Sequence, residues 1–130
     1  MILAYFTESD FTKCSPPCKL SDMDPTFMAM LDTARHHSGE LAQASGDKCV
    51  YKLTSAYRTP EHERKQGRPG TSSHTKRVAA DIACPDSRTF YYVITGLLKA
   101  GFTRIGINHA KGFVHVDADS GKPPRLIFGY

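Results

Sequence analysis

The sequence predicts an α+β fold, with a small, mainly antiparallel sheet and helices packed on one side. Two local patterns carry this prediction: an amphipathic helical period near residues 87–98, and short strand-like runs separated by turn residues. The third observation is size, because 130 residues with 40% apolar and 23% charged side chains fit one compact domain. We therefore predict a single domain over residues 1–130.

Residues 1–24 predict an irregular leader, because the segment has no sustained period and contains the pair Pro16–Pro17. We expect its aromatic side chains, Phe6 and Phe11, to pack onto the core. The leader is therefore expected to be part of the domain rather than a separate unit.

A helix is predicted to follow, because Asp24 suits an N-cap and Pro25 the first helical position. The helix is expected to end near Ser38–Gly39 or to resume through Leu41 and Ala42. Residues 49–55 then alternate with β-branched and aromatic types and predict a strand that delivers Arg58 at its end.

The next segment, residues 60–73, is polar and interrupted by glycine and proline, which favours a short helix followed by a surface loop. Residues 78–83 form a short apolar run broken by one carboxylate, Asp81, and their length predicts a buried strand. A second long helix is expected to begin at a cap on Asp86 or Ser87 and to stop at Gly101.

Two further strands, residues 104–108 and 112–117, are separated by so few residues that they predict a hairpin. After a turn-like stretch, residues 126–128 are expected to close an edge of the sheet. The predicted sheet is therefore built mainly from antiparallel neighbours.

The strand at residues 113–117 carries polar side chains where a plain core would not place them. Alternation puts Phe113, His115 and Asp117 on one face, with steps of about 6.6 Å, and Val114 and Val116 on the other. If the valines face the core, the histidine and the carboxylate project into a cleft. Such a pair suits a metal site or acid–base chemistry on a rigid scaffold.

Asp81 raises the same question, because an isolated buried carboxylate is costly unless it meets a cation or hydrogen-bond donors. His74, Asp81 and His115 would form a set of two histidines and one carboxylate that leaves one tetrahedral position of a zinc ion open, as in catalytic sites. The plain alternative is a surface His74, an Asp81 satisfied by backbone amides and a half-buried His115.

Three segments, SAYRTPEH, SSHTKRVAADIA and FVHVDAD, resemble the M15 family of zinc peptidases, which cleave D-amino-acid-containing peptides of the bacterial cell wall. The matching segments lie in order from about residue 50 to residue 119. The resemblance implies a Hedgehog/DD-peptidase-like fold and a Zn²⁺ cofactor. It also implies a peptidoglycan peptide as substrate, cleaved by a carboxypeptidase or by an endopeptidase of the endolysin type.

The family pattern SxHxxGxAxD begins at Ser73, so the resemblance implies that His74, Asp81 and His115 are the metal ligands. It also implies that Arg58 faces a substrate carboxylate, for which a planar guanidinium fork is well suited. Ser73 is expected to hydrogen-bond either substrate or loop backbone.

The sequence departs from the family pattern in two places. Arg77 replaces the glycine, which implies either that this position needs no positive φ or that the loop is shaped differently. No carboxylate lies between Asp86 and His115 to act as general base. The nearby titratable candidates are His109 and Asp117, and Asp117 is alternatively a partner that orients a ligand.

The missing acidic base leaves a second class of function open: a zinc-binding recognition module of the same fold without hydrolysis. Net charge argues against a third class of function, a nucleic-acid-binding domain. A formal charge of +4, from 17 Lys and Arg against 13 Asp and Glu, is modest and scattered, so we expect no nucleic-acid partner.

We also expect a monomer. We expect no membrane partner, because no apolar run approaches the roughly 18–20 residues that cross a bilayer. The start of the chain, MILAYFTESD, lacks the basic region of a secretory signal. We therefore expect synthesis in the cytoplasm without a signal peptide, and action on the wall after release or phage delivery. The four cysteines are expected to be thiols, with a bridge or metal clip between Cys14 and Cys18 left open.

Overall fold

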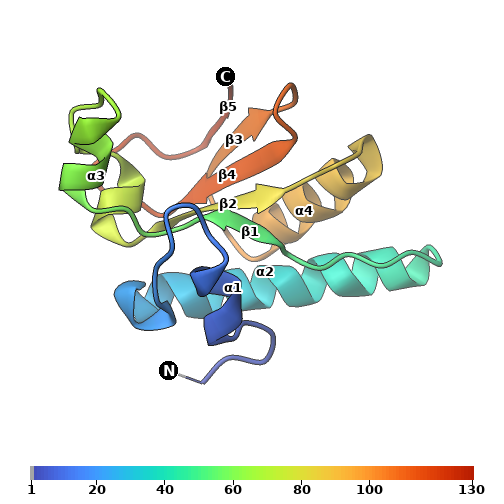
Figure 1. Ribbon diagram of the computed structural model, residues 1–130. Coiled ribbons are helices and arrows are strands. Elements are labelled where there is room, and N and C mark those ends of the chain that lie inside the picture. The colour runs from blue at the N-terminus through green and yellow to red at the C-terminus, as the bar shows by residue number, and fades with distance from the viewer. Residues whose placement is uncertain (1) are drawn as a thin grey trace.

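A computed structural model describes residues 2–130 and shows an α+β fold built on a five-stranded sheet in the order β1-β2-β4-β3-β5 (Figure 1). The predicted fold class is confirmed. The helices are α1 (Glu8–Thr12), η1 (Leu20–Asp22), α2 (Pro25–Ala44), α3 (Pro60–Lys65), η2 (Ser73–Lys76) and α4 (Ser87–Lys99). The strands are β1 (Leu53–Ser55), β2 (Ala79–Ala83), β3 (Arg104–Asn108), β4 (Phe113–Asp117) and β5 (Leu126–Gly129).

The sheet is antiparallel except at one edge. Strand β4 lies between β2 and β3 and is antiparallel to both, and the β3–β4 hairpin forms as predicted. Strand β5 closes the edge beside β3, but the two run parallel because the chain crosses over after β4. The last segment of the chain is thereby placed along the sheet that carries the predicted site.

The two faces of the central strands differ sharply in chemistry. Ile82, Val114 and Val116 are fully buried, and the long helices α2 and α4 lie together on one side of the sheet (Figure 1). Asp81 and His115 are directly paired across β2 and β4 and project from the other face. The alternation predicted for β4 is therefore correct.

Helix α2 begins as predicted, because the Asp24 carboxylate accepts a hydrogen bond from the Phe27 amide at 2.9 Å and Pro25 takes the first helical position. It continues without a break to Ala44, as the longer alternative expected. Helix α4 packs closely on it at Gly96, where an added Cβ would lie only 2.7 Å from the Ala34 carbonyl oxygen. The glycine therefore allows the two long helices to pack closely against each other.

The leader is more ordered than predicted. Phe6 and Phe11 are buried as expected, but the segment contains the short helices α1 and η1. At α1 the Asp10 carboxylate accepts a hydrogen bond from the Thr7 amide at 2.9 Å, a local cap that outweighs the lack of a longer period.

The strand predicted over residues 49–55 is wrong in length, because β1 pairs with β2 only over its last three residues. Side chains from Cys49 to Ser55 still alternate between buried and exposed, which is the pattern that the sequence displayed. An irregular register between Leu53 and Ser55 ends the regular ladder.

The cysteines are free thiols, as predicted, and Cys14 and Cys18 are both buried. Within residues 2–130, no helix has the length and apolar character that a membrane crossing requires.

Candidate metal centre

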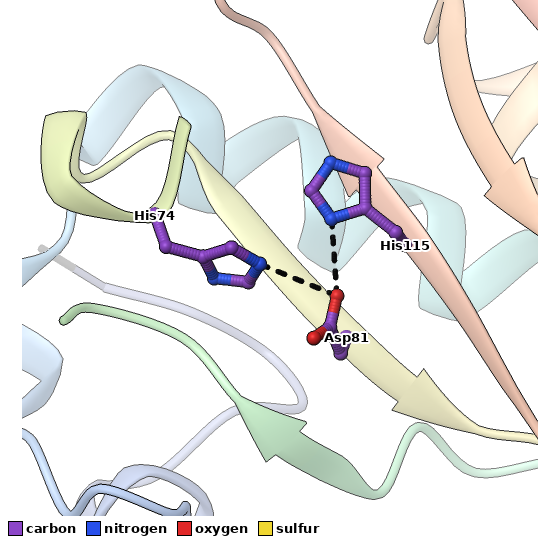
Figure 2. Close-up of side chains that lie close together, drawn as sticks. All are labelled: His74, Asp81 and His115. Carbon is purple, nitrogen blue, oxygen red and sulfur yellow. Dashed lines mark hydrogen bonds and ion pairs between the residues drawn. The ribbon is translucent and has the colours of Figure 1, made fainter. Parts of the chain in front are cut away.

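Three side chains from separate elements converge on one point, as Figure 2 shows: His74 from η2, Asp81 from β2 and His115 from β4. Asp81 Oδ1 lies 3.3 Å from His74 Nε2 and 3.0 Å from His115 Nδ1. One ligand atom from each residue lies within 4.8 Å of the other two, and all three residues are buried. The structure therefore brings together the ligand set that the sequence predicted, and the plain alternative for these residues is wrong.

The second nitrogen of each histidine ring is fixed by an acceptor. His74 Nδ1 lies 2.7 Å from the Ala56 carbonyl oxygen, and His115 Nε2 lies 2.7 Å from Asp117 Oδ2. Because both partners can only accept, these nitrogens must donate. The remaining nitrogens, His74 Nε2 and His115 Nδ1, therefore face the Asp81 carboxylate.

This arrangement fits a cation. With neutral histidines, two nitrogen lone pairs and a carboxylate oxygen would point at one another inside the protein, which is unfavourable unless a positive charge lies between them. Burial alone would raise the pKa of Asp81, but when the facing nitrogens of His115 and His74 carry protons, their hydrogen bonds and positive charge hold this pKa well below its usual range. The donor set of two imidazoles and one carboxylate is one that zinc prefers.

The same environment raises the pKa of His115. Burial acts to lower it, but the hydrogen bonds to Asp117 and Asp81 and their negative charges outweigh burial. A proton and a metal ion would therefore compete for Nδ1 of His115. At a pH low enough to protonate Nδ1, metal binding is expected to displace that proton, so metal affinity should fall as pH falls.

Asp117 is 1% exposed and is held from several sides. Its Oδ2 accepts from His115, while its Oδ1 accepts from Arg104 Nε at 2.7 Å and from the Asp119 amide at 3.1 Å. Burial would raise its pKa, but these hydrogen bonds lower it to about 2. Asp117 is thus an ionised carboxylate that fixes the ring of His115, which is the orienting alternative predicted for it.

Arg58 lines the same cavity and is held by two partners. Its Nε donates to Glu63 Oε2 at 3.0 Å and its Nη1 donates to Ser55 Oγ at 3.1 Å. Glu63, from α3, has no exposed side-chain surface and also accepts a hydrogen bond from the Ser72 hydroxyl. Burial raises the pKa of Glu63, but hydrogen bonds from Ser72 and the charge of Arg58 lower it overall.

Ser73 joins a second charge network. Its hydroxyl donates to Asp119 Oδ2 at 2.9 Å, and its oxygen accepts a hydrogen bond from Lys122 Nζ at 3.0 Å. Lys76 Nζ donates to both Asp119 oxygens, at 3.1 and 3.0 Å. Ser73 is therefore bound to side chains of the C-terminal segment rather than to loop backbone.

The structure does not bring His109 to the metal ligands. The ring of His109 is exposed and stacks on Phe90 of α4, with centroids 5.5 Å apart, and the residue does not line the cavity that holds Asp81 and His115. The turn between β3 and β4 carries it to the end of the hairpin, away from the ligand-bearing part of the strands. Its predicted role as general base therefore has no support in the geometry.

Arg77 adopts the left-handed conformation, with φ of 70°, so the idea that this position needs no positive φ is wrong. Non-glycine residues there typically cost about 1 kcal/mol or more. Other contacts compensate: Arg77 Nη1 donates to the Asp22 carbonyl oxygen at 2.9 Å, and the guanidinium lies 4.4 Å from the centroid of the Tyr57 ring.

The cavity that contains the ligands has a volume of about 470 Å³ and is lined by five cationic side chains and three carboxylates. Phe128 and Tyr130, near the C-terminus, form an aromatic part of its wall. Gly106 makes room for them, because a Cβ there would lie 2.5 Å from the Phe128 ring. The C-terminal segment therefore completes the cavity.

Sequence reasoning missed four residues of this site: Glu63, Arg104, Asp119 and Lys122. Alternation along the DAD segment could have found Asp119, which follows Asp117 by two positions. Arg104 and Lys122 carried no local signal, since they contact Asp117 and Ser73, which lie 13 and 49 positions away. Glu63 meets Arg58 only five positions before it, but it lies in a polar stretch that was expected to be solvated.

Two histidines and a carboxylate are buried together beside a cavity, and the outer nitrogen of each ring is fixed. This arrangement on an α+β scaffold is typical of a metal-dependent hydrolase. The particular family is shown by comparison of the sequence: the family model described as Peptidase M15 matches residues 4–117. This chain belongs to the peptidase M15 family and is a metallopeptidase. No curated protein and no solved structure matches the chain.

Proposed function

We propose that this protein hydrolyses peptide bonds in peptidoglycan stem peptides or cross-links, using zinc held by His74, Asp81 and His115. The observation that carries the proposal is the ligand set itself, converging in a cavity with an excess of cationic side chains. M15 peptidases are zinc enzymes, and the donor atoms here match that metal. A cationic cavity favours peptides that carry carboxylates.

When bound, zinc would polarise the scissile carbonyl and lower the pKa of a bound water toward about 7. The chain's own residues prepare that site. Asp117 accepts the proton at His115 Nε2, which keeps Nδ1 directed at the metal position. The Ala56 carbonyl does the same for His74 through its Nδ1.

Arg58 would hold a carboxylate of the substrate. Glu63 and Ser55 accept hydrogen bonds from its Nε and Nη1, which fixes the plane of a guanidinium that lines the cavity. A fixed guanidinium loses little conformational entropy when a ligand binds. This preorganisation favours a carboxylate near the scissile bond, the terminal one in a carboxypeptidase reaction.

We further propose that the protein acts as a monomer and reaches the wall after release from the cell or by phage delivery. Size-exclusion chromatography with light scattering measures the first of these directly. A dimer at micromolar concentration would contradict the monomer.

The proposal is tested by mass spectrometry of purified peptidoglycan after digestion by the zinc-loaded protein, with a chelator-treated sample in parallel. Loss of one terminal alanine would identify a carboxypeptidase, and new ends inside the stem or cross-link would identify an endopeptidase. Absence of chelator-sensitive products from Gram-negative and Gram-positive walls would contradict the proposed function.

One observation favours a second candidate, a zinc-binding recognition module without hydrolysis. Each carboxylate that lines the cavity is already engaged: Glu63 by Arg58, Asp81 by the two histidines, and Asp117 by His115 and Arg104. A group free to take a proton from water is a usual part of a peptidase site. Zinc-dependent binding of wall fragments without cleavage would support this second function.

A further inference from the structure

Ser72 and Ser73, directly before His74, each contact a separate group of charged side chains. The Ser72 hydroxyl donates to Glu63, whose carboxylate is bound to Arg58 at 3.0 Å. This first group contains one carboxylate and one guanidinium, which form an ion pair. The charge of Arg58 is therefore balanced inside the protein before any substrate binds.

In the second group the positive and negative charges are not equal in number. The Ser73 hydroxyl donates to Asp119, and this single carboxylate faces two ammonium groups, Lys76 at 3.0 Å and Lys122 at 3.7 Å. Asp119 is 2% exposed at its side chain, so its charge is committed to these partners. One positive charge is left over beside the ligand-bearing loop.

That excess charge is accessible at Lys122. Its side chain is 35% exposed and lines the metal cavity, whereas Lys76 is not among the residues that line it. The ammonium of Lys122 has three N–H donors. One of these N–H groups donates to Ser73 Oγ at 3.0 Å. The nearest Asp119 oxygen, at 3.7 Å, lies beyond hydrogen-bond distance. Two N–H donors of Lys122 are therefore available to a ligand.

Lys122 also lies outside the residues that define the family, since the match ends at Asp117. Backbone contacts hold it in place: the Lys122 amide donates to the Asp119 carbonyl oxygen at 3.1 Å, and Arg104 Nη1 donates to the Pro123 carbonyl oxygen at 2.5 Å. The lysine is thus presented from a fixed turn rather than from a free tail.

We propose that Lys122 forms a second anion-binding position in the cavity, and that it selects acidic peptides bearing a carboxylate in addition to the one held by Arg58. The inference rests on the proposed peptidase function and narrows its substrate class. An ammonium that keeps two free donors next to a buried, fully paired carboxylate binds an anionic ligand with a charge-assisted hydrogen bond.

The test uses two synthetic stem pentapeptides that differ at one internal position, a free carboxylate in one and a carboxamide in the other. The zinc-loaded wild type is expected to cleave the carboxylate form with a kcat/KM at least about tenfold higher, the size of one charge-assisted hydrogen bond. Lys122→Met is expected to abolish that preference, and Lys122→Arg to retain most of it.

Lys76→Met is the matched control. It removes the other lysine of Asp119 without removing a cavity-lining group, so the preference for the carboxylate form should persist. Equal zinc content and equal melting temperatures for the three variants show that the comparison concerns the substrate and not the fold.

Equal kcat/KM for the two peptides in the wild type would overturn the inference, and so would a Lys122→Met variant that loses activity equally on both. If the wild type cleaves neither peptide and also releases no chelator-sensitive product from whole walls, the proposed function fails. Whenever neither peptide is cleaved, calorimetry with the same peptides decides the inference separately. Tighter binding of the carboxylate form, lost in Lys122→Met and kept in Lys76→Met, would then support it, and equal binding would overturn it.

Discussion

The site has two halves that are held in different ways. In the strand half, Asp81, His115 and Asp117 lie on β2 and β4, where backbone pairing places Asp81 opposite His115 and Ala79 opposite Asp117. In the loop half, Arg58 and Lys122 come from irregular segments. Their charged groups are positioned by polar side-chain contacts, Arg58 by Glu63 and Ser55 and Lys122 by Ser73, rather than by a strand ladder.

This difference indicates which half of the site is held more firmly in place. Strand register is fixed by many backbone hydrogen bonds at once, so Asp81 and His115 keep their spacing even if one neighbour changes. The third residue of the set, His74, comes from η2 and is held by the Ala56 carbonyl oxygen. Each loop residue depends on one or two polar partners, and some of these are distant in sequence, as in the contact between Ser73 and Asp119 across 46 positions. The metal half is expected to be robust, and the substrate half to be adjustable.

The largest effect is expected from the strand half itself. His115→Ala removes a ligand atom at the point where the three donors meet, so bound zinc and peptide hydrolysis should both be lost, with a fall of about 10³-fold or more in turnover. Metal analysis by atomic emission and a peptide hydrolysis assay measure the two properties. His62→Ala, a histidine change on α3 outside the cavity, serves as control, and full activity of His115→Ala would refute the ligand assignment.

Asp117→Asn should have the next largest effect. It keeps the shape of the side chain but removes the negative charge that fixes His115 Nε2–H and pairs with Arg104, so zinc affinity or activity should fall about 10–100-fold. Competition with a metal chelator gives the affinity. Activity that remains low when zinc is saturating would instead indicate a direct role of Asp117 in proton transfer.

Arg58→Lys tests whether the loop half is independent of the metal. Lysine keeps the charge but cannot reproduce the planar fork that Glu63 and Ser55 hold, so kcat/KM should fall about tenfold while zinc content is unchanged. Parallel zinc and kinetic measurements separate the two halves. Loss of zinc in this variant would mean that they are coupled.

Glu63→Gln tests the same half through pH and stability. Because the folded-state pKa of Glu63 is lowered, its charge contributes stability above the usual glutamate pKa of about 4.5, and that contribution is lost as pH falls below it. The variant should be about 1–3 kcal/mol less stable than wild type at pH 7. Urea unfolding at pH 7 and pH 3 should show this gap shrinking in acid, and a gap that is constant with pH would contradict the role of the charge.

The smallest effect is expected at His109. Its ring contacts Phe90 and does not reach the ligands, so His109→Ala should change turnover by less than about twofold at equal zinc content. Steady-state kinetics across the histidine pH range provide the measurement. A large loss of kcat would restore His109 as a candidate base and would contradict the placement of the hairpin turn.

Much of the fold could be predicted because its signals are local. The cap at Asp24, the helical period of α4 and the alternation of β4 each depend on neighbouring residues, and each was confirmed. The short helix α1 and the true length of β1 were not predicted. Both depend on side-chain capping or on strand pairing that no repeating pattern reports.

The candidate site divides in the same way. By itself the sequence determined the α+β class, because helical period and strand alternation are properties of the local chain. It predicted His74, Asp81 and His115 as metal ligands only through the resemblance to the M15 family, since residue type and spacing left a plain alternative open. Only the tertiary structure decided that Asp117 contacts His115, that His109 lies elsewhere, that Glu63 and Lys122 line the cavity, and that Asp119 binds Ser73 beside it. These roles depend on distances between segments far apart in the chain, which are fixed by packing and ion pairing after the local elements have formed.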